Sequence, residues 1–182
     1  SALSREWLQI RDTIVRPLLQ APSAQPSSPA APAVQNKLVQ GVSLSQLMNA
    51  MYRKNYTVYQ NPYQLNIAGV RAENIQPNSF DDCICVFYKN NTGNWVLEKF
   101  ACTTEPGTFY LNNPMNVSGT AIVVPGQYVN SHKIGLHKGH YTALVQQGPI
   151  NIIRDANKDN VLDFTSGTVI TGIYGINIHR AS

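Results

Sequence analysis

The hydrophobic pattern divides the chain into a helical start, a stretch poor in large apolar residues, and a long region of short alternating segments. Within the first twenty residues, apolar side chains recur at intervals of three and four, at Leu3, Trp7, Ile10, Ile14 and Leu18. This spacing predicts an amphipathic helix over residues 1–20. A short isolated helix is only marginally stable in water, so its apolar stripe needs a partner in this chain, another subunit or a larger assembly.

The second stretch covers residues 21–41. From Ala21 to Gln35 it consists almost entirely of Ala, Pro, Ser and Gln, a composition that cannot build a hydrophobic core. We therefore predict an extended linker over residues 21–41. The main domain is then expected over residues 42–182, and it could be truncated at its C-terminal end.

A short amphipathic helix is predicted at the start of this domain, in the segment SLSQLMNAMYRKN. Ser43 or Ser45 can cap its N-terminus, and Arg53 and Lys54 suit its last turn. Its apolar face consists of Leu44, Leu47, Met48 and Met51. We interpret this face, including the two methionines, as core.

From Tyr56 onward the chain alternates between β-rich runs and turn residues, with no βαβ rhythm. The most distinct element is a hairpin over residues 82–102, whose two runs are joined by residues 90–94, NNTGN. The other runs, which we interpret as strands and turns, are residues 56–60, 63–71, 107–114, 119–128, 140–146, 150–155, 161–164 and 171–182. The expected fold class is mainly β (β-rich α+β), with one short helix preceded by the tethered N-terminal helix.

Composition narrows the functional classes. Only 13% of residues are charged, and the polar uncharged surface this implies suits an extracellular, cell-envelope or virion protein. The net charge of +4 favours anionic surfaces such as cell-wall polymers. No Lys/Arg run marks a nucleic-acid-binding arm, and no apolar run approaches the roughly 20 residues of a membrane span.

The chain has three cysteines, Cys83, Cys85 and Cys102. An odd number of cysteines argues against a complete disulfide framework. On a strand, Cys83 and Cys85 share one face and cannot easily bridge each other, whereas Cys102 could pair with either across the hairpin. We favour the interpretation that all three are buried thiols that pack as small apolar side chains.

The segment RDANKDNVLDF carries oxygen-bearing side chains at alternate positions, at Asp155, Asn157, Asp159 and Asp163. It resembles the first part of a calcium-binding loop, in which Val161 would add a backbone carbonyl. Asn160 stands where glycine is expected, and Ser166 stands where a glutamate should close the site. A polar hairpin loop is the favoured interpretation and a calcium site the alternative. No other cofactor is expected.

Three of the four histidines, His132, His137 and His140, lie in the segment NSHKIGLHKGHY. No acidic residue lies among them, and their spacing is not that of a helical zinc site. We interpret the segment as an exposed basic loop. Metal binding is the alternative, and binding of phosphate or carboxylate by the histidines with Lys133 and Lys138 is an intermediate possibility.

The closing run TGIYGINIHRAS delivers His179 and Arg180 at the end of a predicted strand. A rigid strand end is well suited to aim a general base, although a solvent-facing histidine on an ordinary last strand is the alternative. This run resembles the histidine strand of the L,D-transpeptidase (YkuD-type) cell-wall enzymes. Together with GTAIVVPGQY, it also resembles a domain of phage and Bacteroidetes peptidoglycan hydrolases of the endolysin kind. The likeness covers residues 43–182.

The resemblance implies an L,D-transpeptidase-like β-sandwich or barrel in which His179, with the adjacent Arg180, forms the candidate catalytic set. The histidine would deprotonate a cysteine that attacks a peptidoglycan stem peptide. In the family that cysteine lies in a downstream Ser-x-Gly-Cys segment, which these residues lack. The chain is therefore expected to be catalytically incomplete. The rival hypothesis is a non-enzymatic virion or cell-surface protein that binds assembly partners through residues 1–20.

Overall fold

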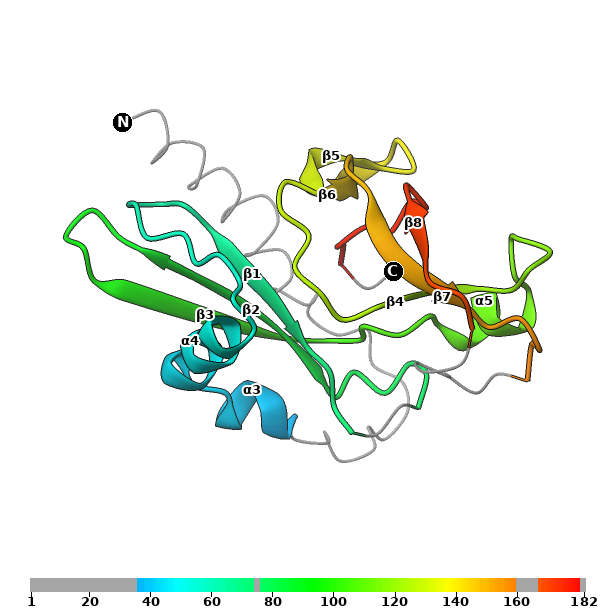
Figure 1. Cartoon of the computed structure of the whole chain (residues 1–182), viewed down its shortest axis with the longest axis horizontal. Coiled ribbons are helices and arrows are strands. Elements are labelled where there is room, and N and C mark those ends of the chain that lie inside the picture. Colours follow the sequence, from blue (N-terminus) through cyan, green and yellow to red (C-terminus); the bar gives the residue numbers. More distant parts are fainter. Residues whose placement is uncertain (1–35, 74–75, 160–166, 181–182) are drawn as a thin grey trace, which may run out of the picture. The chain divides into compact units, whose positions relative to one another are not determined.

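The computed structural model describes residues 36–73, 76–159 and 167–180 and is rich in β-strand (Figure 1). The prediction of a mainly β chain is confirmed, with a few short helices and open sheets. The predicted helix over residues 1–20, most of the predicted linker and the run at residues 161–164 lie outside the described residues. Among the helices that the structure describes, none has the length and apolar character needed to cross a membrane.

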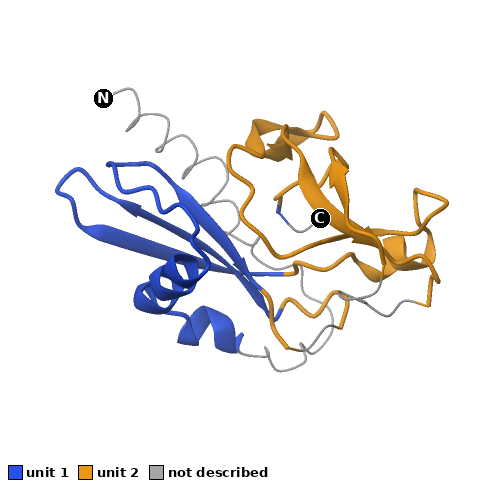
Figure 2. Ribbon diagram, in the orientation of Figure 1, with its two compact units in different colours: residues 1–70, 81–102, 180–182 blue, residues 71–80, 103–179 orange. Residues whose placement is uncertain are grey.

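The chain divides into two compact units where the sequence suggested one domain (Figure 2). Unit 1 comprises residues 1–70, 81–102 and 180–182, and unit 2 comprises residues 71–80 and 103–179. The hydrophobic pattern could not reveal this division, because the chain passes between the units more than once and each segment alternates in the same way.

Within its described residues, unit 1 comprises a three-stranded antiparallel sheet and two helices (Figure 1). Its strands, in the order β1-β2-β3, are β1 (Asn66–Val70), β2 (Asp82–Lys89) and β3 (Trp95–Cys102), and its helices are α3 (Lys37–Gly41) and α4 (Leu44–Arg53). The predicted hairpin is confirmed, with Lys89 paired to Trp95 beside the turn. The Asn90 side chain accepts hydrogen bonds from the backbone N–H groups of Thr92 and Asn94, and Gly93 supplies the positive φ of +82°.

The predicted helix is α4, and Ser43 is its N-cap. The Ser43 hydroxyl accepts from the Gln46 N–H at 3.3 Å, while the Gln46 side chain accepts from the Ser43 N–H at 2.9 Å, which is a capping box. Helix α3 differs from expectation, because it lies within the predicted linker. The Asn36 side chain caps it by accepting from the Leu38 and Val39 N–H groups.

The core of unit 1 forms on one face of β2. Alternation along the strand places Cys83, Cys85 and Phe87 on that face, each fully buried, and Leu47 of α4 packs against them. Partly buried apolar side chains that complete the cluster include the predicted helix face and part of α3, namely Leu44, Met48, Met51, Leu38 and Val39. The interpretation of the α4 methionines as core is confirmed.

Unit 2 contains a three-stranded sheet of order β4-β7-β8 and a separate hairpin, β5-β6. The elements are α5 (Thr108–Asn112), β4 (Ala121–Val123), β5 (His132–His137), β6 (Tyr141–Gln146), β7 (Ile150–Arg154) and β8 (Ile170–Gly172). Its core joins Leu111, Ile122 and Ile153, which come from α5, β4 and β7.

Several predicted elements of unit 2 differ in the structure. Residues 107–114, expected among strands and turns, contain α5, whose Leu111 is buried while Phe109 and Tyr110 stay exposed. The basic segment expected as a loop contains strand β5. The closing run is not one strand, because pairing stops after Gly172 and resumes only as a single bridge between Leu144 and Ile178. In unit 1, residues 56–60 form no strand.

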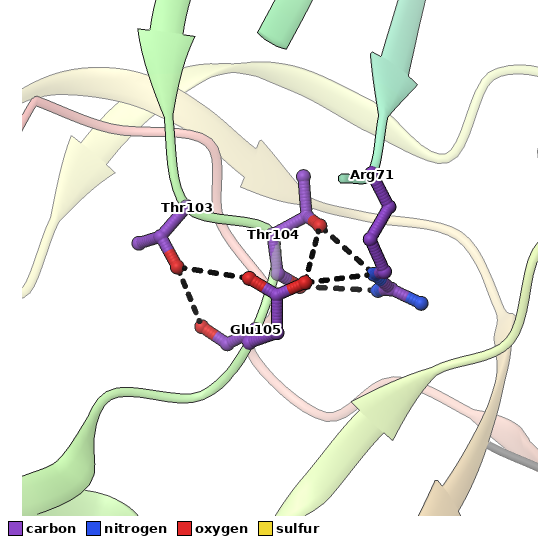
Figure 3. A network of polar contacts seen from close by, with 4 residues as sticks. All are labelled: Arg71, Thr103, Thr104 and Glu105. Carbon is purple, nitrogen blue, oxygen red and sulfur yellow. Dashed lines mark hydrogen bonds and ion pairs between the residues drawn. The ribbon is translucent and has the colours of Figure 1, made fainter. Parts of the chain in front are cut away.

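A buried polar network joins the two chain segments that enter unit 2 after Val70 and after Cys102 (Figure 3). The Arg71 guanidinium lies 3.1 Å from the Glu105 carboxylate and donates to the Thr104 hydroxyl at 3.0 Å and the Thr104 carbonyl at 3.2 Å. The Thr103 hydroxyl donates to the other Glu105 oxygen at 3.2 Å. Because the Glu105 side chain is fully buried, these contacts replace the water that its charge would otherwise need.

Candidate functional site

The β5-β6 hairpin brings two of the predicted site histidines together. His137 ends β5 and is paired in register with Tyr141 at the start of β6. The bridge from Leu144 to Ile178 then lays the last residues of unit 2 along β6, since Leu144 and Ile178 exchange both backbone hydrogen bonds at 3.0 and 2.9 Å. His179 follows this bridge directly and meets the end of the hairpin.

His179 is held by two neighbours although it is exposed. Its ring stacks on His137, with centroids 4.1 Å apart and planes inclined by 23°. Its Nδ1 lies 3.1 Å from the Tyr141 hydroxyl. The stacking fixes the plane of the imidazole ring, and the Tyr141 contact fixes the position of Nδ1. A group that transfers protons needs such a fixed orientation.

His137 is oriented by an amide whose own orientation is fixed. The Asn177 Oδ1 accepts the Gln146 backbone N–H at 3.0 Å, so its Nδ2 is the atom that faces His137 Nδ1, also at 3.0 Å. An amide nitrogen can only donate, so His137 Nδ1 must accept, and a neutral His137 carries its proton on Nε2. Desolvation lowers the pKa of His137, and nearby positive charge on His179, Lys138 and His140 lowers it further.

The other two histidines do not join this cluster. The His132 ring lies between the Ser131 hydroxyl, 2.9 Å from Nδ1, and the Ile176 carbonyl, 2.9 Å from Nε2, which is a structural position. His140 is exposed at the hairpin turn. In the described ranges, no three His, Cys, Asp or Glu side chains are grouped so as to hold a metal ion. The structure gives Lys138 a different partner, the Tyr110 hydroxyl at 3.2 Å.

The cysteines lie in unit 1 and are free thiols. Cys83 and Cys85 are fully buried with their sulfurs 3.6 Å apart, which confirms the prediction of buried thiols for these two, whereas Cys102 is half-buried. Burial raises the pKa of Cys85 to about 12, assisted by the hydrogen bond with Cys83 and the Cys83 charge. Cys85 is therefore a poor nucleophile at neutral pH.

The remaining candidate residues fall in two places. Asp155 is buried at the end of β7, Asn157 and Asp159 are exposed in the loop that follows, and Asp163 lies outside the described residues, as do Asn160, Val161 and Ser166. Arg180 is exposed and is assigned to unit 1. A hollow with a volume of about 410 Å³, lined by Gln46, Asn49, Tyr52 and Arg53, belongs to α4 and its C-terminal turn and includes none of the histidines.

Sequence reasoning missed three residues of the cluster: Tyr141, Gln146 and Asn177. Tyr141 could have been found from the hairpin register, because only the turn separates it from His137. Asn177 lies two residues before His179, so it could have been placed near the same hairpin once the backbone bridge was known. Gln146 orients Asn177 through its backbone N–H, and its side chain accepts from the Tyr174 and Ile176 N–H groups of the closing run. Residue type alone does not predict either contact.

Comparison with family models, with curated proteins and with solved structures finds no match to this chain.

Proposed function

We propose that His179 is the proton-transferring histidine of a peptidoglycan-processing domain of the cysteine L,D-peptidase or L,D-transpeptidase kind, with an L,D-transpeptidase-like fold. The observation that carries the proposal is the restraint on the His179 ring, which stacks on His137 and meets the Tyr141 hydroxyl at 3.1 Å. Under the alternative hypothesis of a solvent-facing histidine on an ordinary last strand, these two contacts would have no functional role.

In this mechanism the histidine takes the proton of a cysteine thiol, and the thiolate attacks a carbonyl of the stem peptide. The amine leaves with the proton from the imidazolium, and a thioester remains until water or a second amine resolves it. Cys83 and Cys85 are unsuited to this step, because both are fully buried in unit 1. The proposal assigns the nucleophile to a Ser-x-Gly-Cys segment that follows the histidine strand in a longer chain, as the resemblance implies.

Tyr141 and His137 act as positioning residues for His179. For His179 to act as the base, its Nδ1–H would donate to the Tyr141 oxygen, which leaves Nε2 unprotonated and free to accept the thiol proton. Because Asn177 favours the neutral form of His137, the stack places one cation rather than two at the site when His179 accepts a proton.

The experiment uses a protein extended through any residues encoded after Ser182, with purified peptidoglycan as substrate and mass spectrometry of the products. His179→Gln is expected to lower the rate by about 10²–10⁴-fold. His140→Gln removes an exposed histidine from the same hairpin and serves as the matched control, with activity expected unchanged. Full activity in His179→Gln, or a gene that encodes no cysteine segment after Ser182, would exclude the mechanism.

A second candidate function is supported by exposed apolar side chains in unit 2. Phe109 is 69% exposed, and Met115 and Val117 are each 90% exposed, so these apolar side chains are available for contact with a partner. They favour the non-enzymatic role in a virion or cell-surface assembly. The N-terminal helix proposed as the anchor lies outside the described residues. Activity on peptidoglycan that depends on His179 would argue against a purely structural role.

A further inference from the structure

The end of β7 is rigidly held at Asp155. Strand β7 pairs with β4 as far as Arg154 and Ala121, and the Asp155 N–H then donates to the Thr120 carbonyl at 3.0 Å. Gly119 allows this close approach, because a Cβ atom there would lie 1.8 Å from the Asp155 carbonyl oxygen. The first residue of the loop after β7 is therefore fixed by the sheet and not by the loop itself.

The Asp155 carboxylate is only half satisfied. The residue is 4% exposed, and its Oδ1 accepts the Lys158 N–H at 3.1 Å, whereas its Oδ2 is buried without a hydrogen-bond partner. The nearest cation in sequence is directed elsewhere, since the Arg154 guanidinium donates to the Gly119 carbonyl at 2.8 Å and lies over the Tyr174 ring. A buried anionic oxygen without a donor or a cation is strongly unfavourable, so this atom points to a missing positive partner.

The loop offers further donors of one chemical kind. Asn157 and Asp159 follow at alternate positions, with Asn157 Nδ2 2.7 Å from an Asp159 oxygen. In the described part of the loop, Asp155, Asn157 and Asp159 offer carboxylate and amide oxygens as ligands, which suit a hard cation and not zinc or copper. We propose that this loop binds Ca²⁺, with Asp155 Oδ2 as the buried anchor and Asn157 and Asp159 as outer ligands.

Calcium fits this loop better than magnesium does. Ca²⁺ accepts six to eight oxygens in irregular geometry, whereas Mg²⁺ demands a near-ideal octahedron. Two carboxylates with an adjacent Lys158 make a weakly charged site, so the dissociation constant should fall near about 10⁻⁴–10⁻³ M, as in extracellular modules. The site does not involve His179 and stands independently of the proposed enzymatic function.

The test is calorimetric titration of the full chain with CaCl₂ and with MgCl₂, together with thermal unfolding in CaCl₂ and in EDTA. We expect saturable binding of Ca²⁺ and a Tm increase of roughly 3–6 °C at about 10 mM Ca²⁺. Asp155→Asn should abolish both effects, and Asp159→Asn should weaken binding roughly tenfold or more. Glu73→Gln removes an exposed carboxylate elsewhere in unit 2 and should change neither.

The comparison in EDTA separates loss of binding from loss of folding. Because Asp155→Asn removes an unpaired buried charge, this variant should be at least as stable as the parent without calcium. If it fails to fold, Asp159→Asn carries the test, because Asp159 is exposed and its substitution should leave the fold intact. Absence of calcium binding by the parent, or equal binding by the parent and Asp159→Asn, would overturn the proposal.

Discussion

The restraint on His137 shows how a single side chain can acquire a preferred protonation state from its neighbours. Desolvation and nearby positive charge lower its pKa below the ordinary value of 6.5, and Asn177 presents a donor where a second proton would have to sit. Protonation of His137 would therefore require the Asn177 amide to lose its bond to Gln146 or to turn away. The stacked His137 and His179 rings are therefore expected to carry at most one positive charge over the pH range in which His137 stays neutral.

This arrangement predicts the pH dependence of stability. The unfolded chain binds more protons than the folded chain between the lowered pKa of His137 and 6.5, so stability is complete above about 6.5 and declines as pH falls through the folded-state pKa. Nuclear magnetic resonance titration of His137 in the folded and the urea-unfolded protein measures both values. His137→Gln should flatten this part of the stability profile, and Asn177→Asp should raise the His137 pKa. A folded-state pKa at or above the unfolded value would contradict the assignment.

Arg71 and Glu105 give a second prediction at the residue scale. Arg71→Met would remove the guanidinium from the buried Glu105 carboxylate, and loss of one partner from a buried pair costs about 3 kcal/mol. Glu105→Gln should cost less, because an amide oxygen still accepts from Thr103 or Arg71 and the guanidinium that loses its anionic partner is 21% exposed to water. Urea denaturation of the two variants measures the difference. Equal losses would mean that the ion pair contributes no more than a neutral hydrogen bond.

The candidate site could be predicted only in part from the sequence. His179 stood out because it follows an alternating run, and His137 because it lies in a histidine-rich segment. Their contact could not be predicted, because it depends on the single bridge between Leu144 and Ile178, which pairs residues 34 apart in the chain. Tyr141 and Asn177 were missed for the same reason, since their roles come from register and not from residue type.

At the scale of elements, prediction from the sequence succeeded where the interacting residues are close neighbours in the chain. The Ser43 N-cap of α4 and the turn of the β2-β3 hairpin at residues 90–94 involve residues within five positions, and both are present as predicted. Prediction failed where tertiary packing decided the outcome. Residues 108–112 form a helix whose Leu111 packs in the unit 2 core. In the same way, Leu38 and Val39 of α3 pack against the unit 1 core.

The junction between β4 and β7 gives a prediction at this scale. Gly119 has a φ of +92°, and a Cβ atom there would overlap the Asp155 backbone, which cannot move without breaking the sheet. Gly119→Ala should therefore destabilise unit 2 by about 3 kcal/mol, from backbone strain and overlap together. Gly139→Ala is the matched control, because Gly139 has a φ of +77° and no atom within 4 Å of its Cβ position. It should cost only about 1 kcal/mol.

Thermal unfolding of the two glycine variants provides the measurement. If Gly119→Ala and Gly139→Ala are equally destabilised, the close approach of the two chain segments is absent in solution. Repeating the thermal unfolding of both glycine variants with added calcium is a further control, because the proposed calcium site begins at the same Asp155 backbone.

At the scale of the whole molecule, composition and architecture carry different information. The sequence predicted a mainly β chain correctly, because period-two alternation is a local property. The division into two units was missed, because segments 71–80 and 103–179 of unit 2 are separated in the chain by two strands of unit 1. No local pattern shows which alternating runs share a sheet. Charge is the one global property that the sequence specifies completely.

The net charge of +4 predicts adsorption to anionic cell-wall polymers without any specific site. Retention of the protein on purified cell walls should fall steeply between about 0.05 M and about 0.5 M NaCl, because exposed charges are screened over shorter distances as salt rises. Lys133→Glu, at an exposed position, changes the net charge from +4 to +2 by replacing one positive with one negative charge, and it should shift release to lower salt. Retention that resists salt and is unchanged in Lys133→Glu would instead indicate specific recognition, for which the exposed apolar side chains of unit 2 are the first surface to test.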